Sequence, residues 1–151
     1  MPNHIHLIAV PHDSKEGFAR AIGEAHRRYT RRINLRENWR GRLWQEIFAS
    51  FPLDERHLLA AARYIEMNAV AAKLVEHPED YPWSSARAHL KGEDDQLAKV
   101  APLSDFVPDW SSFLKLSPLD EVDILHRHER TGRLLGENGF VKNLEKTLGR
   151  K

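Results

Sequence analysis

Cysteine is absent from the 151 residues of the chain, which excludes disulfide bonds, thiolate zinc sites and a cysteine nucleophile. Long apolar runs are missing as well, whereas a membrane-spanning helix needs roughly 20 consecutive apolar residues. The apolar residues at the start are too few for a signal peptide, and no basic flank precedes them. Together with a mean hydropathy of −0.58, these absences predict one cytoplasmic globular domain with no membrane partner.

The charge is nearly balanced overall, with 23 Lys and Arg against 22 Asp and Glu, but one segment is strongly basic. Between residues 19 and 42 every basic side chain is an arginine, and two tryptophans lie among or beside them. Arginine forks bind phosphate, and indole rings stack on unpaired bases. A solvated helix face is the alternative interpretation. The candidate DNA contacts are Arg27, Arg28, Arg31, Arg32, Arg42 and Trp44.

Apolar periodicity predicts two strands and several helices. Residues 3–10 and 42–51 are expected to be strands. A helix capped by Ser14 should run to about residue 35, with Tyr29 on its apolar stripe and the arginines mostly off it. Asp54 is expected to cap a second helix over 55–75, and further helices are expected near 118–130 and 137–148.

The first strand carries two histidines, in "NHIH". Successive side chains of a strand alternate between its faces, so His4 and His6 should point the same way, about 6.5–7 Å apart. Ile5, Leu7 and Ala9 should then point into the core. Two imidazoles at that spacing can share one metal ion if a further ligand completes the site.

The second helix offers that ligand in "YIEMN", where Tyr64 and Asn68 are four residues apart and so share one face. His4, His6 and the Asn68 oxygen would form a mixed nitrogen and oxygen set with open positions, which suits Mg²⁺ or Mn²⁺ better than zinc. A phenol with a pKa near ~10 is a poor nucleophile until a Lewis acid polarises its target. Attack by Tyr64 on a phosphodiester would leave a phosphotyrosine and a free 3′-hydroxyl.

Four blocks of the chain carry a resemblance to a known family: "MPNHIHL", "GRLWQ", "ARYIEMNAV" and "HPEDYPWSSARAHL". Their order and spacing resemble those of the REP-associated tyrosine transposases, which are single-tyrosine transposases of the HUH superfamily. The similarity runs from Met1 to about Gly92, and the "HERTGRLLG" tail resembles the C-terminal extension of many such chains.

The resemblance implies a metal-binding role for His4 and His6, a nucleophilic role for Tyr64 and a third metal ligand at Asn68. It implies an α+β fold, with the RRM-like or ferredoxin-like antiparallel sheet of the HUH palm and helices packed on it. The catalytic domain would span 1–92, and a small helical extension would span 104–151. Family members cut and rejoin single-stranded DNA beside palindromes that fold as hairpins, through a 5′-phosphotyrosine intermediate.

Departures from the family pattern leave alternatives open. Family chains carry a further strand, helix and strand before the "MPNHIHL" block, so we expect an N-terminally truncated domain whose first strand lacks a neighbour. Ala69 replaces a usual proline, and Ile47 stands where arginine is common. The alternatives to a transposase are an inactive remnant that binds hairpin DNA and a metal-dependent hydrolase that does not use Tyr64. Neither a monomer nor a homodimer is favoured by the sequence.

Overall fold

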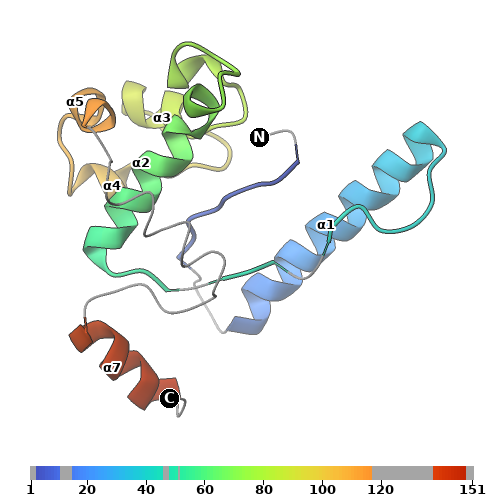
Figure 1. The fold of residues 1–151 in the computed structure, drawn as a ribbon, viewed down its shortest axis with the longest axis horizontal. Coiled ribbons are helices and arrows are strands. Elements are labelled where there is room, and N and C mark those ends of the chain that lie inside the picture. The colour runs from blue at the N-terminus through green and yellow to red at the C-terminus, as the bar shows by residue number, and fades with distance from the viewer. Residues whose placement is uncertain (1–2, 11–14, 46–47, 51, 117–137, 149–151) are drawn as a thin grey trace. The chain divides into compact units, whose positions relative to one another are not determined.

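The computed structural model describes residues 3–10, 15–45, 48–50, 52–116 and 138–148 (Figure 1). The chain divides into two compact units. We call Ala9–Ser50 the arginine unit, and we call Met1–Ile8 together with Phe51–Lys151 the tyrosine unit. The helix expected near 118–130, the Ser14 cap and Ile47 lie outside the described residues.

The predicted α+β fold is wrong for the part of the chain that the structure describes, which is 57% helix and contains no strand or sheet. Residues 3–10 do not form the expected strand, and the described parts of the second expected strand, residues 42–45 and 48–50, are not in a strand either. Alternation in the sequence favours an extended backbone, but a strand also needs a neighbour that pairs with its N–H and C=O groups. Neither segment has such a neighbour among the described residues.

The arginine unit is one long helix, α1 (Lys15–Glu37), with a returning segment along its apolar side. Asn38 reverses the chain with a φ of 54°, a left-handed conformation that asparagine tolerates better than most residues. The Asn34 Nδ2 then donates to the Gly41 carbonyl at 2.9 Å. Further along, the rings of Phe18 and Phe48 meet edge to face, 5.8 Å apart. The helix is thus confirmed as amphipathic, and its core position is Ile33, 9% exposed.

The tyrosine unit is built on α2 (Glu55–Ala71), which confirms most of the helix expected over 55–75. The side chain of Asp54 accepts a hydrogen bond from the His57 N–H at 2.9 Å, so the predicted N-cap is also confirmed. Four buried alanines allow close packing along α2: Ala60, Ala61, Ala62 and Ala69.

Four short helical segments follow α2: η1 (Pro78–Asp80), α3 (Ala86–Lys91), α4 (Ala101–Ser104) and α5 (Trp110–Lys115). Trp110 and Leu114 of α5 pack on Ala62 of α2, and α3 lies beside both helices (Figure 1). The last described helix, α7 (Asn138–Leu148), confirms the helix expected over 137–148.

Candidate functional site

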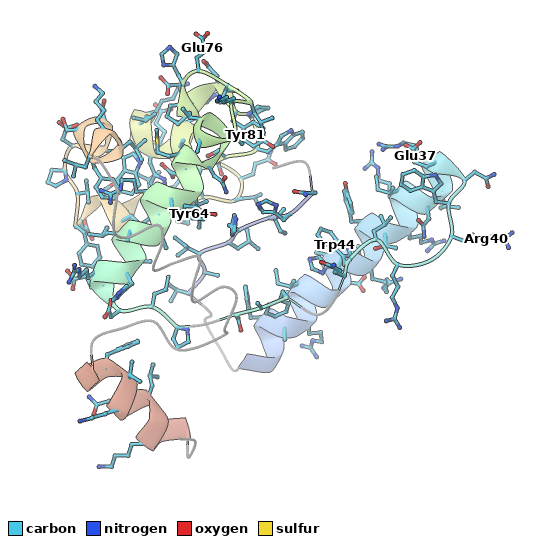
Figure 2. All side chains as sticks on the ribbon, in the orientation of Figure 1. Glu37, Arg40, Trp44, Tyr64, Glu76 and Tyr81 are labelled. Carbon is cyan, nitrogen blue, oxygen red and sulfur yellow. The ribbon has the colours of Figure 1, made fainter. Side chains whose placement is uncertain are left out.

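Tyr64 of α2 lies against the N-terminal segment (Figure 2). Its ring meets the imidazole of His6 edge to face, with 5.5 Å between the ring centroids and an interplanar angle of 71°. The imidazoles of His4 and His6 are in turn 4.9 Å apart, centroid to centroid. The structure therefore brings both histidines and Tyr64 into one row of rings, from parts of the chain almost 60 residues apart.

The position of the histidines reverses one part of the sequence expectation. Ile8 packs on Ala60 and Ala61 of α2, so the even-numbered side chains of the segment face the helix. Ile5 and Leu7 are 55% and 59% exposed, and Ala9 is exposed too. The prediction that these three enter the core is wrong. Alternation places 4, 6 and 8 on one side, but only the helix decides which side is covered.

The His4 ring has a hydrogen-bond partner in its neighbour, Asn3. Nδ1 of His4 lies 2.7 Å from the Asn3 side-chain oxygen, which can only accept a hydrogen bond. With the Asn3 carboxamide in this orientation Nδ1 is the donor, and Nε2 of the neutral ring would be left to bind a metal ion. Histidines that bind metals are commonly oriented in this way, by a hydrogen bond from the other ring nitrogen to an oxygen.

Asn68 lies one turn beyond Tyr64 on α2, and its Nδ2 is buried without a hydrogen-bond partner in the described ranges. Leaving a buried amide N–H unpaired costs about 1–3 kcal/mol. Rotating the carboxamide by half a turn exchanges Nδ2 with Oδ1 and presents an acceptor at the same place. An oxygen there could bind a cation, and the role of Asn68 as a metal ligand stays a prediction.

The donor set near Tyr64 suits an incompletely coordinated divalent ion. Within the described residues, no group of three or more His, Cys, Asp or Glu side chains could hold a metal ion by itself. An ion at His4 and His6 would thus draw on the neutral oxygen of Asn68 and on oxygens from water or substrate. Mg²⁺ and Mn²⁺ accept such ligands, and the expected cofactor stays a prediction.

The predicted DNA contacts all belong to the arginine unit. Arg27, Arg28, Arg31 and Arg32 line one hollow on α1, of about 470 Å³, together with Leu35. Arg42 is exposed on the returning segment. Trp44 is half-buried, and its indole stacks on His26 with centroids 3.9 Å apart and an angle of 11°. One face of the Trp44 ring is therefore already occupied.

Two other aromatic rings of the arginine unit are more exposed than Trp44. Tyr29 is 52% exposed and Trp39 is 58% exposed. The expectation that Tyr29 lies in the core, on the apolar stripe of the helix, is therefore wrong. Its ring lies at the edge of that stripe and contacts Trp44, with centroids 5.7 Å apart. Both rings offer area on which a base could stack.

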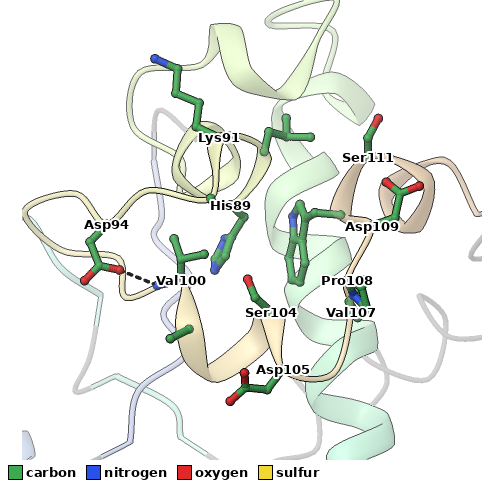
Figure 3. A pocket seen from close by; sticks show the side chains of 14 residues that line it. His89, Lys91, Asp94, Val100, Ser104, Asp105, Val107, Pro108, Asp109 and Ser111 are labelled. Carbon is green, nitrogen blue, oxygen red and sulfur yellow. Dashed lines mark hydrogen bonds between the residues drawn. The ribbon is translucent and has the colours of Figure 1, made fainter.

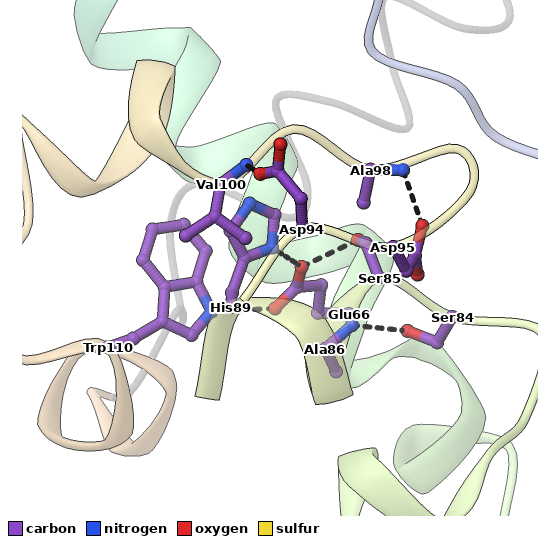
Figure 4. Close-up of polar contacts among 10 residues, drawn as sticks. All are labelled: Glu66, Ser84, Ser85, Ala86, His89, Asp94, Asp95, Ala98, Val100 and Trp110. Atoms are coloured by element: carbon purple, nitrogen blue, oxygen red, sulfur yellow. Dashed lines mark hydrogen bonds and ion pairs between the residues drawn. The ribbon is translucent and has the colours of Figure 1, made fainter. Parts of the chain in front are cut away.

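Sequence reasoning missed a buried polar cluster that joins α2, α3 and α5. Glu66 is 2% exposed, and its carboxylate accepts from the Ser85 hydroxyl and the His89 Nδ1, both at 2.6 Å (Figure 4). The Trp110 indole N–H donates to the other carboxylate oxygen at 2.7 Å. Glu66 lies two residues from Tyr64, so the cluster holds α2 in place just behind the candidate nucleophile. Its only signal in the sequence is a glutamate among the core positions of an alanine-rich helix.

His89 and Trp110 also line a hollow of about 780 Å³ beside α4, into which Ser104 projects (Figure 3). The rings of His89 and Trp110 stack there, with centroids 4.5 Å apart. None of the predicted site residues is among those that line this hollow in the described part of the chain.

Comparison with protein-family models, with curated proteins and with solved structures finds no match for this chain. The transposase resemblance therefore stays a prediction, and the functional argument depends on the residues themselves. None of the described helices is long and apolar enough to cross a bilayer.

Proposed function

We propose that this chain is a metal-dependent, tyrosine-dependent DNA strand transferase that acts on single-stranded DNA beside a hairpin. The observation that carries the proposal is the contact between the Tyr64 and His6 rings, with His4 adjacent to them. A nucleophile and a pair of metal-binding imidazoles must reach the same phosphate for this chemistry. The 5.5 Å between the Tyr64 and His6 rings is compatible with that requirement.

The proposed reaction is one in-line displacement at phosphorus. The Tyr64 oxygen loses its proton and bonds to phosphorus, while the bond from phosphorus to the 3′ oxygen breaks and that oxygen takes up a proton. The products are a 5′-phosphotyrosine and a free 3′-hydroxyl. Because the phosphoester bond is exchanged and not hydrolysed, a second 3′-hydroxyl can attack the phosphotyrosine and rejoin the strand.

The chain's own residues have separate roles in this proposal. Three side chains would hold Mg²⁺ or Mn²⁺: His4, His6 and Asn68. Asn3 orients the His4 ring. The bound ion would polarise the phosphodiester. The edge-to-face contact with His6 limits the rotation of the Tyr64 ring, so the phenol stays close to the imidazoles.

A covalent adduct tests the proposal directly. The full chain is incubated with Mn²⁺ and a labelled oligonucleotide that carries a hairpin and a 3′ flank, and adducts are resolved on a denaturing gel. We expect an adduct from the natural chain and from Tyr81→Phe, a matched loss of a half-buried phenol, but none from Tyr64→Phe. An adduct that persists in Tyr64→Phe contradicts the proposal.

The two other functions give different results in the same assay. DNA binding without any adduct would indicate an inactive hairpin-binding remnant, which retains the arginine unit but not the chemistry. Hydrolysis that persists in Tyr64→Phe and stops in His6→Ala would indicate a metal-dependent hydrolase.

A further inference from the structure

The arginines of α1 form a stripe that contains one acid. Six residues share one face of the helix, because the steps between them alternate between three residues and one: Glu24, Arg27, Arg28, Arg31, Arg32 and Leu35. The last five line the hollow of about 470 Å³. Glu24 lies at the N-terminal end of this stripe.

Glu24 binds two of the four arginines through its two oxygens. Arg27 donates from Nε and from Nη2 to the carboxylate, and Arg28 donates from Nε, each over 2.7 Å. These hydrogen bonds and the two positive charges lower the pKa of the Glu24 carboxyl from 4.5 to about 2. The carboxylate is therefore ionised at any pH at which the protein would meet DNA.

The other two arginines have no such partner. Among the described residues no acidic side chain pairs with Arg31 or Arg32, and the acid at the C-terminal end of the helix, Glu37, pairs with Arg36. Two guanidinium groups that line the hollow, those of Arg31 and Arg32, are therefore available to an anion. The other two, those of Arg27 and Arg28, already bind the Glu24 carboxylate.

We propose that Glu24 is a built-in competitor for phosphate: a DNA backbone binds first at Arg31 and Arg32, and it engages Arg27 and Arg28 only by displacing the Glu24 carboxylate. The reason is geometric, because Arg27 uses the edge of its fork on Glu24, and the same edge would grip a phosphate. The competitor lowers the affinity for any polyanion. It therefore shortens the time that the chain stays on DNA without the right hairpin.

The inference rests on the proposed function only in naming DNA as the ligand, so binding is measured where no chemistry can occur. Full-length Tyr64→Phe protein is titrated into a labelled oligo(dT) with EDTA present, and fluorescence anisotropy gives the affinity at several salt concentrations. Adding Glu24→Gln should tighten binding roughly threefold to tenfold at low salt. The slope of log affinity against log salt concentration should also become steeper by about one to two, because two arginines gain access to phosphate.

Two comparisons separate competition from a simple change in net charge. Glu37→Gln removes the same charge from the same helix but frees an arginine outside the hollow, so the salt dependence should stay as in the parent. In a chain that already carries Arg27→Gln and Arg28→Gln, adding Glu24→Gln should not raise the affinity through these arginines, because neither guanidinium group remains to be released. Circular dichroism of each variant checks that the helix content is unchanged.

The outcomes decide the proposal either way. The proposal would be overturned if Glu24→Gln and Glu37→Gln raised the affinity equally. It would also be overturned if Glu24→Gln raised the affinity by the same factor in the chain that lacks Arg27 and Arg28. Unchanged binding when Arg31→Gln and Arg32→Gln are combined would overturn it as well. An adduct at Tyr64 in the cleavage assay would still support the proposed function in each of these cases.

Discussion

Replacing Glu66 by alanine should destabilise the tyrosine unit more than any single surface change. The Glu66 carboxylate accepts three hydrogen bonds of 2.6–2.7 Å, from Ser85, His89 and Trp110, and these donors come from two other parts of the unit. The side chain is 2% exposed, so water cannot take the place of the carboxylate without opening the packing.

The magnitude follows from the donors that the substitution leaves behind. The Trp110 and His89 residues are 5% and 8% exposed, so each would keep a buried N–H without an acceptor, at about 1–3 kcal/mol each. The Ser85 hydroxyl is only half-buried and can turn to water, so it adds less. Allowing for the space left by the lost methylenes, we expect Glu66→Ala to lower the free energy of unfolding by about 4 kcal/mol.

Guanidinium chloride titration followed by far-UV circular dichroism measures this change, because most of the signal comes from helices. Ser85→Ala removes one donor and leaves the carboxylate its other two, so its cost should be about 1 kcal/mol. Glu76→Ala, an exposed acid beyond α2, serves as the control and should change stability by less than about 0.5 kcal/mol. A cost for Glu66→Ala no larger than that for Ser85→Ala would refute the view that this carboxylate joins the three helices.

Three further predictions concern the N-cap, α1 and the histidines. Asp54→Ala removes the acceptor of the His57 N–H and should lower the free energy of unfolding by about 1 kcal/mol; no change in the same titration would show that the cap adds nothing. In an NMR titration of the side-chain carboxyl groups, Glu24 should titrate near pH 2. Its stabilising effect should be present above pH 4.5 and lost as the pH falls toward 2. An ordinary glutamate pKa would contradict the pairing with Arg27 and Arg28. His6→Ala should abolish DNA cleavage and leave salt-sensitive DNA binding unchanged, since the arginines act through phosphates; an equal loss of binding would show that the two units do not divide these tasks.

The helices were predictable because their signals are local. Asp54 caps α2, alanine and leucine dominate the turns that follow, and the spacing of Tyr64 and Asn68 assigns both to one face whatever surrounds the helix. In the same way, the spacing of the arginines on α1 separates them from the apolar stripe before any contact is known.

The lack of a sheet in the described residues could not be predicted from the sequence, because strand pairing is not local. The alternating pattern of residues 3–10 correctly indicates that His4 and His6 share a side, and the rings do lie together. The pattern does not indicate which side is covered. Ile8 and His6 face α2. Ile5 and Leu7 remain exposed although both are more apolar than His6, against the usual ranking of hydrophobicity.

By itself, the sequence determined α1, α2 and α7, the faces of α1 and α2 and the residue types able to do phosphoryl chemistry, since each depends on neighbours within a few positions. Only the tertiary structure decided that Tyr64 meets His6, that Glu66 is buried among three donors and that Trp44 stacks on His26. Those contacts join residues far apart along the chain. Their existence depends on the balance of packing and hydrogen bonding over a whole unit, which no short pattern encodes.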